Sequence, residues 1–118
     1  MSSASLEPEF LTNLPPVPDD EFCVYGTVYA YPEHADALEV AYAIATHIAK
    51  FEPGTVYYCI SRDTDNPAVF HFFERYTGRK AFDAHNEQPA VQKLLKEDKY
   101  IKDVTAKFAK PILPVWAG

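Results

Sequence analysis

The segment Phe22–Tyr31 constrains the fold more strongly than any other part of this sequence. It is rich in aromatic and β-branched residues, which predicts a β-strand that ends at Pro32. Alternate side chains of a strand point to opposite faces of the sheet. Both faces are apolar here, one with Phe22, Val24, Val28 and Ala30 and the other with Tyr25, Tyr29 and Tyr31. A strand of this kind must be covered on both sides.

A long helix is predicted over residues 33–51. Acidic residues stand in its first turns, where the helix dipole favours them, and Pro53-Gly54 ends it. Two neighbouring apolar stripes follow helical spacing, one with Leu38, Ala41, Tyr42, Ala45 and Ala49 and one with Val40, Ile44, His47 and Phe51.

The remaining segments complete a β-α-β-β-α-β order. Strands are predicted over 55–62, 68–76 and 103–110, and short helices over 78–86 and from Pro89 onward. This order is typical of a ferredoxin-like α+β fold with one antiparallel sheet. Helices on one face leave the other face bare, so the second apolar face of the first strand predicts a partner sheet. The simplest partner is a second copy of the chain, and we therefore expect a homodimer.

The chain of 118 residues has the length of one domain. Residues 1–21, with four prolines, predict an extended N-terminal arm; residues 22–110 form the domain, and residues 111–118 a tail that holds Trp116. Acidic groups dominate residues 1–52, whereas lysines dominate from Lys93 onward. This asymmetry indicates either an ordinary solvated surface or an acidic arm that lies near the lysine-rich end.

The charge and composition of the chain limit the classes of binding partner and the cellular location that we expect. The formal net charge is −6, and an acidic surface repels phosphate, which argues against nucleic acid. The first residues lack the basic and apolar regions of a signal peptide, and no stretch is long enough to span a bilayer. Cys23 and Cys59 form no paired motif and are expected to be free thiols. We expect a cytoplasmic protein without a membrane partner.

The run from Gly54 to His85 resembles the antibiotic biosynthesis monooxygenase family. That family has a Gly-led second strand, an Asp-Pro turn, a third strand ending in Glu-x-Trp, and a short helix that ends in histidine. Here Glu74-Arg-Tyr76 stands for Glu-x-Trp, and His85 follows the aromatic residue by nine positions. The resemblance extends over about residues 22–110. Tyr76 in place of Trp keeps an aromatic wall and adds a hydroxyl group.

The resemblance implies a dimeric α+β barrel with a pocket between the sheet and the helices of each subunit. It also implies a cofactor-independent monooxygenase that acts on a small hydrophobic aromatic compound, such as a quinol, an anthrone or a polyketide intermediate. The haem-degrading branch of the fold carries an Asn where this chain has Gly26, which argues against haem degradation. Two alternatives stay open: a non-catalytic small-ligand-binding or stress-associated barrel, and a cyclase or isomerase.

We expect no cofactor and no metal. No G-x-G-x-x-G or phosphate loop is present, and His71 and Glu74, three apart on a strand, point to opposite faces. A deprotonated anthrone or quinol can give an electron directly to dioxygen, so the protein needs a dry pocket, a base and a partner for the oxyanion.

The candidate catalytic residues are His85 and Tyr76. His85 is either the base or a helix-end histidine that caps a carbonyl, and Tyr76 either holds a phenolate or is a core tyrosine. Glu74 either orients His85 or binds a helix-end N–H. His47 either faces solvent or meets His85 across the pocket. Strand parity and the resemblance together predict the pocket walls as Val24, Gly26, Val28, Phe70, Phe72, Glu74, Tyr76 and His85.

Overall fold

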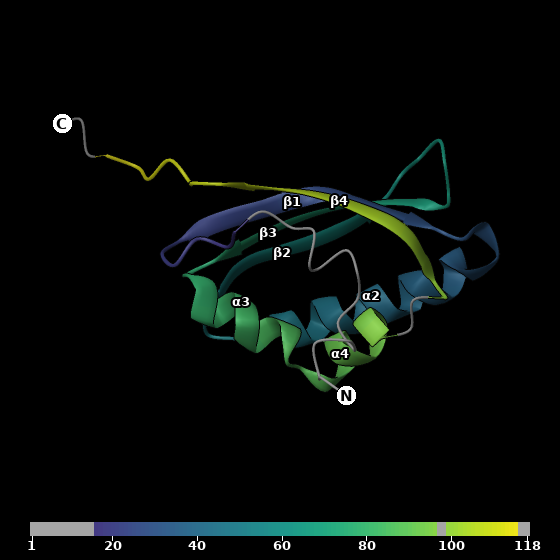
Figure 1. Cartoon of the computed structure of the whole chain (residues 1–118), viewed down its shortest axis with the longest axis horizontal. Helices are drawn as coiled ribbons and strands as arrows, with labels where there is room; N and C mark the ends of the chain where they lie inside the picture. Colours follow the sequence, from purple (N-terminus) through teal and green to yellow (C-terminus); the bar gives the residue numbers. More distant parts are fainter. Residues whose placement is uncertain (1–15, 97–98, 116–118) are drawn as a thin grey trace.

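The computed structural model describes residues 16–96 and 99–115, and Figure 1 shows them as a curved sheet with the helices gathered on one face. The strands are β1 (Phe22–Ala30), β2 (Thr55–Arg62), β3 (Val69–Tyr76) and β4 (Ile101–Ala109). The helices are the 3-10 turn η2 (Pro32–His34), α2 (Ala35–Ala49), α3 (Arg79–Asn86) and α4 (Pro89–Lys96). The ferredoxin-like α+β fold expected from the sequence is confirmed.

The sheet has the order β2-β3-β1-β4, and every neighbouring pair is antiparallel. β1 is central because it pairs with β3 along one edge and with β4 along the other. β4 begins two residues earlier than predicted, since Ile101 is buried and pairs with Ala30 beyond an irregularity at Tyr29/Ala30. β1 ends at Ala30, one residue earlier than the predicted end at Tyr31.

Two clusters of buried side chains fill the space between the sheet and the helices. The first lies under α2 and α4 and includes Leu38, Tyr42, Phe70 and Leu94. The second lies near α3 and is built on Phe22, Val24 and Tyr76, with Phe82 and Phe108 packed against it. Only the Leu38–Ala49 stripe of α2 faces this core, and the neighbouring stripe is exposed at Val40, Ile44 and Phe51. Phe72 contacts both clusters.

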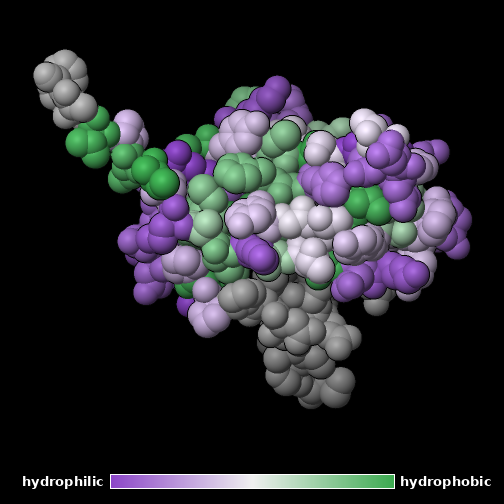
Figure 2. All heavy atoms as spheres, turned by 90° about the horizontal axis from the view of Figure 1, so that it is seen from above, coloured by the Kyte–Doolittle hydropathy of each residue, from purple (hydrophilic) through white to green (hydrophobic). Residues whose placement is uncertain are grey.

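The opposite face of the sheet is open in the single chain. Seen from above, its centre carries apolar and weakly polar residues, and charged residues gather toward the two ends (Figure 2). Tyr25 stacks on Phe73 with ring centroids 6.3 Å apart, and Tyr57 meets the same Phe73 ring at 5.9 Å. These three rings stay 40% to 53% exposed. A large aromatic surface on a sheet face of this kind is typical of an interface.

The end of the arm is attached to the domain. The Asp19 carbonyl accepts a hydrogen bond from the Arg79 N–H at 3.2 Å, and Glu21 pairs with Arg75 at 2.6 Å. Lys110 pairs with Asp20 and donates to the Glu21 carbonyl at 3.0 Å. The acidic arm and a lysine therefore do meet at this point.

The rest of the arm, residues 1–15, and the tail residue Trp116 lie outside the described residues, so the domain limits remain predictions. The part of the tail that is described runs away from the sheet with Ile112, Leu113 and Val115 exposed (Figure 1). Among the described residues, no helix has the length and apolar character needed to cross a bilayer.

Candidate active site

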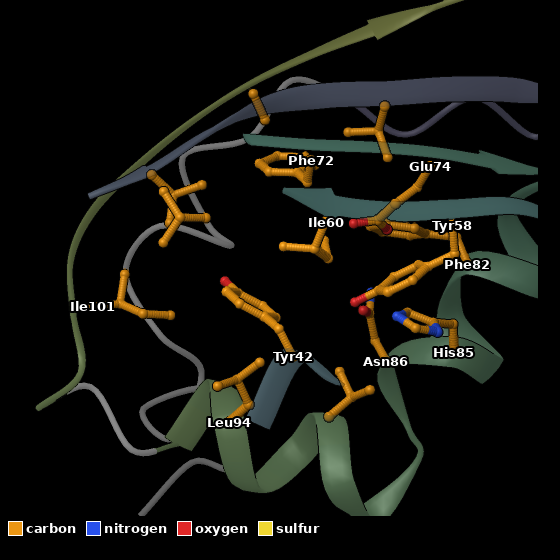
Figure 3. Close-up of a pocket in the computed structure, with 15 residues that line it drawn as sticks. Tyr42, Tyr58, Ile60, Phe72, Glu74, Phe82, His85, Asn86, Leu94 and Ile101 are labelled. Carbon is orange, nitrogen blue, oxygen red and sulfur yellow. The ribbon is translucent and has the colours of Figure 1, made fainter. Parts of the chain in front are cut away.

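A cavity of about 110 Å³ lies between the sheet and the helices, bordered by both core clusters. Its walls come from all four strands and from α2, α3 and α4 (Figure 3). They are mostly aliphatic and aromatic: Val24, Val28, Tyr42, Tyr58, Ile60, Phe72, Glu74, Phe82, His85, Asn86, Val91, Leu94, Ile101, Val104 and Ala106. Such a site takes an apolar ligand and orients it with a few polar groups.

The polar groups gather at one end of the cavity. Glu74 extends from β3 and His85 and Asn86 extend from α3, so that their polar atoms face the same space (Figure 3). Tyr42 points its hydroxyl into the cavity from α2 on the other side, near Leu94. The cavity therefore has one polar pole, the Tyr42 hydroxyl on the other side, and an otherwise apolar lining.

His85 is the buried polar residue at this pole, with only 3% of its surface exposed. Its Nδ1 lies 2.7 Å from Oε1 of Glu52, whose side chain is 9% exposed. The same Oε1 accepts a hydrogen bond from the Thr55 hydroxyl at 2.9 Å. With Glu52 ionised, Nδ1 carries the proton and Nε2 is left with a free lone pair. A carboxylate therefore fixes the orientation and the tautomer of the imidazole.

The backbone around Gly54 explains how Glu52 reaches α3. Glu52 lies in the turn between α2 and β2, which Pro53 and Gly54 complete. A Cβ at Gly54 would lie 2.3 Å from the Cβ of Ala81, so only glycine lets this turn approach α3 so closely. The approach brings Glu52 within hydrogen-bond distance of His85. Among the described residues, the second carboxylate oxygen of Glu52 is buried without a hydrogen-bond partner.

Glu74 is the second carboxyl group at this pole. Its Oε1 accepts a hydrogen bond from the Tyr76 hydroxyl at 2.5 Å. Burial raises the pKa of Glu74, and the nearby Glu52 carboxylate acts in the same direction, against the Tyr76 hydrogen bond and the His85 charge. Burial likewise raises the pKa values of Tyr58 and Tyr76 far above the ordinary tyrosine range. Both phenols are therefore neutral hydrogen-bond donors at any working pH.

Five of the residues predicted as site residues lie on the walls of this cavity: Val24, Val28, Phe72, Glu74 and His85. Strand parity explains the four on β1 and β3, since their side chains all point toward the helices. Glu74 does not contact His85 through a hydrogen bond, and it is Glu52 that takes the orienting position.

The other four predicted residues do not line the cavity. Phe70 and Tyr76 share the expected face but are fully buried, Phe70 against Tyr42 and Tyr76 against Phe22, Phe82 and His85. His47 is exposed on α2 and packs on Phe51, because it belongs to the outer stripe. A Cβ at Gly26 would lie 1.8 Å from the Thr105 carbonyl oxygen, so this glycine serves the β1–β4 approach. It borders a hollow on the open face instead of leaving room in the cavity.

His71 and Glu74 lie on opposite faces, as their spacing predicts. His71 is on the open face, 2.8 Å from Asp63 through Nε2 and 3.2 Å from the Thr27 hydroxyl through Nδ1. This contact and two backbone N–H donors of the Asp63–Pro67 turn hold the pKa of Asp63 below its usual value. The contacts of Asp63 with His71 and with the backbone N–H groups close the turn between β2 and β3.

A family model for antibiotic biosynthesis monooxygenases matches residues 21–97, from the start of β1 to the end of α4. The chain belongs to the antibiotic biosynthesis monooxygenase family. The matched segment of this family member includes Glu52, Glu74 and His85, whereas β4 lies beyond it. No curated protein matches the chain significantly.

Solved structures share the fold of this monooxygenase-family domain. PA3566 of Pseudomonas aeruginosa superposes with a TM-score of 0.73 at 18% identity, over 80% of this chain and 96% of that one. Rv0793 of Mycobacterium tuberculosis gives a TM-score of 0.70 at 19% identity, over 81% and 99%. A crystal structure described as an antibiotic biosynthesis monooxygenase gives 0.68 at 21%, over 78% and 99%. At these identities the likeness establishes the fold.

Proposed function

We propose that this protein is a cofactor-independent monooxygenase, with His85 as the base that deprotonates an aromatic substrate in the cavity. The observation that carries the proposal is the position of His85: a buried imidazole on the wall of an apolar cavity, with Nδ1 held by the Glu52 carboxylate at 2.7 Å. A carboxylate behind an imidazole stabilises the imidazolium that forms when Nε2 takes a proton.

The cavity volume favours a substrate with one ring. An apolar cavity of roughly 150 Å³ accommodates benzene. This cavity, at about 110 Å³, is smaller, so one substituted ring requires the walls to move outward and a fused ring system requires a much larger movement. Among quinols, anthrones and polyketide-like compounds, we therefore favour electron-rich phenols and hydroquinones of one ring. Their hydroxyl would lie at the polar pole with His85, and the ring would lie against Phe72 and the aliphatic walls.

The proposed reaction uses the substrate as the reductant. His85 removes the hydroxyl proton, and the electron-rich anion gives an electron to dioxygen, after which the two radicals combine to a ring peroxide. Loss of water from the peroxide breaks the O–O bond and leaves a quinone. One dioxygen oxygen stays in the product, and the other leaves as water with two substrate hydrogens. The apolar walls keep bulk water from the anion.

We further propose that the protein works as a homodimer through the open face of its sheet. The exposed rings of Tyr25, Tyr57 and Phe73 support this arrangement, because they form an apolar centre that a second sheet would cover. The free thiols of Cys23 and Cys59 are consistent with a reducing compartment, and we propose a cytoplasmic location.

The presence of Glu74 and His85 at one pole of the cavity also supports a second candidate, an isomerase that moves a proton on a small carbonyl compound. An acid and a base held apart in one dry site are what enolisation requires. Because isomerisation adds no oxygen, the mass of the product distinguishes the two reactions.

The test is a panel of one-ring phenols and hydroquinones assayed for dioxygen uptake, with products analysed by mass after reaction under ¹⁸O₂. The proposal predicts uptake above the rate without protein and one ¹⁸O atom in each quinone. Uptake without label in the product, or turnover without uptake, would reject the monooxygenase. Saturable binding without turnover of any compound would favour the non-catalytic binder.

A further inference from the structure

Two carboxyl groups lie near the imidazole of His85, Glu74 on the cavity wall and Glu52 hydrogen-bonded to Nδ1, and their surroundings differ. Glu52 is the partner of His85 Nδ1 at 2.7 Å. Within residues 16–96 and 99–115, no Lys, Arg or His forms an ion pair with Glu74. Glu74 is half-buried and lines the apolar cavity, where a carboxylate without a cation is unfavourable and a neutral carboxylic acid is tolerated.

We propose that Glu74 is a carboxylic acid in the resting protein, and that its O–H donates a hydrogen bond to an anionic or carbonyl oxygen of the cavity's ligand. The inference rests on the proposed function for the site that the ligand occupies, and it adds the group that recognises the ligand's oxygen. It assigns the ligand class as one-ring compounds that present an acceptor oxygen at the polar pole.

One carboxyl oxygen of Glu74 remains available to donate a hydrogen bond to the ligand. Tyr76 donates to Oε1 at 2.5 Å, which occupies that oxygen as an acceptor. The carboxyl group faces the cavity, toward the pole where His85 lies (Figure 3). A proton on the second oxygen would therefore point at the ligand. An ionised Glu74 would instead repel a phenolate formed beside it.

The groups around Glu74 agree with a neutral acid. The titratable side chains that face it are Tyr76 of its own strand, Tyr58 of β2, Tyr42 of α2, His85 of α3 and Glu52 of the turn before β2. Burial and Glu52 raise the pKa of Glu74, whereas Tyr76 and His85 oppose the rise. Burial is the largest of these effects, so the net direction is upward.

Infrared spectroscopy tests the protonation directly, without any turnover. The spectrum of the wild-type protein near neutral pH should contain the carbonyl stretch of a protonated carboxylic acid. We expect Glu74→Gln to lose this band and the matched variant Glu52→Gln to keep it. A band that survives in Glu74→Gln, or a wild-type spectrum without the band, would overturn the proposal. Should Glu74→Gln not fold, Tyr76→Phe provides the assignment: the band must shift, because the donor to Oε1 is gone, and an unshifted band overturns the proposal.

Binding of 4-nitrophenol tests the donation. At pH values where the free ligand is already the phenolate, the wild-type protein should lose affinity as the pH rises, because Glu74 ionises and repels it. Glu74→Gln keeps an N–H donor and cannot ionise, so its affinity should stay constant over the same range. Parallel pH profiles in the two proteins would overturn the donor role. Absence of dioxygen uptake with intact infrared and binding results would reject the monooxygenase and leave this inference standing.

Discussion

Replacement of Glu52 tests whether a carboxylate is needed behind His85. In Glu52→Gln the shape is kept, but the hydrogen bond to His85 at 2.7 Å loses its charge. Charge-assisted hydrogen bonds are worth about 1.5–3 kcal/mol and neutral ones about 0.5–1.5 kcal/mol, so the free energy of unfolding should fall by roughly 1–2 kcal/mol. Both side chains are more than nine-tenths buried, so solvent screening reduces this value little.

The loss of activity should exceed the loss of stability. The amide introduced by Glu52→Gln can donate an N–H to Nδ1 of His85, which moves the imidazole proton to Nε2 and removes the base. We therefore expect turnover to fall by roughly 10²-fold or more, by analogy with the loss of tautomer control in catalytic triads. Glu52→Ala should cost more stability, about 3 kcal/mol, because it breaks a buried pair and also removes the acceptor of Thr55.

Two measurements are needed. Urea unfolding monitored by circular dichroism gives the free energy of unfolding, and steady-state dioxygen uptake on one phenol gives the turnover. Glu33→Gln is the matched control, since Glu33 is exposed and does not line the cavity, and it should change neither quantity. Wild-type turnover in Glu52→Gln would refute the reasoning, whether or not stability falls, because it would show that His85 needs no carboxylate to act.

Three further substitutions test the same geometry. Phe73→Asp places a charge in the aromatic centre of the open face and should shift the protein from dimer to monomer in light scattering, whereas the exposed α2 variant Val40→Asp should not. Gly54→Ala introduces a Cβ 2.3 Å from Ala81 and should lower the free energy of unfolding by about 1–3 kcal/mol, with a loss of turnover as α3 moves away from Glu52; unchanged values in both would contradict the close approach. Because the folded pKa of Glu74 is raised above 4.5, the wild type should lose stability relative to Glu74→Gln as the pH rises from about 4.5 toward that folded pKa, with a constant difference above it; a wild type that gains stability relative to Glu74→Gln over this range would contradict the raised pKa.

Strand parity and element order could be predicted from the sequence because they depend on local patterns. The two-residue repeat of Phe70, Phe72 and Glu74 places these side chains on one face, whatever the rest of the chain does. The alternation on β1 and the turn chemistry of Asp63–Pro67 likewise act over a few residues. Val24 and Val28 therefore reach the cavity wall as expected.

Residues that meet only through tertiary packing could not be placed in the same way. Glu52 lies 33 positions from His85, and no periodicity links a turn to a helix so far along the chain. The Glu-Pro-Gly turn at the end of α2 was the one signal, because a tight turn with glycine often marks a close approach. Tyr42 and Tyr58 were missed as wall residues for the same reason.

Helix α2 shows where a pattern leaves two solutions. Its two apolar stripes are similar in sequence, and only the packing reveals that Leu38 and Tyr42 face the core while His47 faces outward. Gly26 shows that a missing side chain has two meanings, room for a ligand or room for a neighbouring strand. The nearby Thr105 carbonyl shows that Gly26 makes room for the neighbouring strand β4.

The most direct test of the account is the rate at which His85→Asn incorporates ¹⁸O into the product of the best phenol, at saturating substrate. Asparagine keeps a hydrogen-bond donor beside Glu52 but cannot accept the substrate proton at working pH. The account predicts a correctly folded protein whose turnover is lower by roughly 10²–10⁴-fold, with binding of the phenol largely retained. A His85→Asn protein that incorporates ¹⁸O at the wild-type rate would contradict the assignment of His85 as the base.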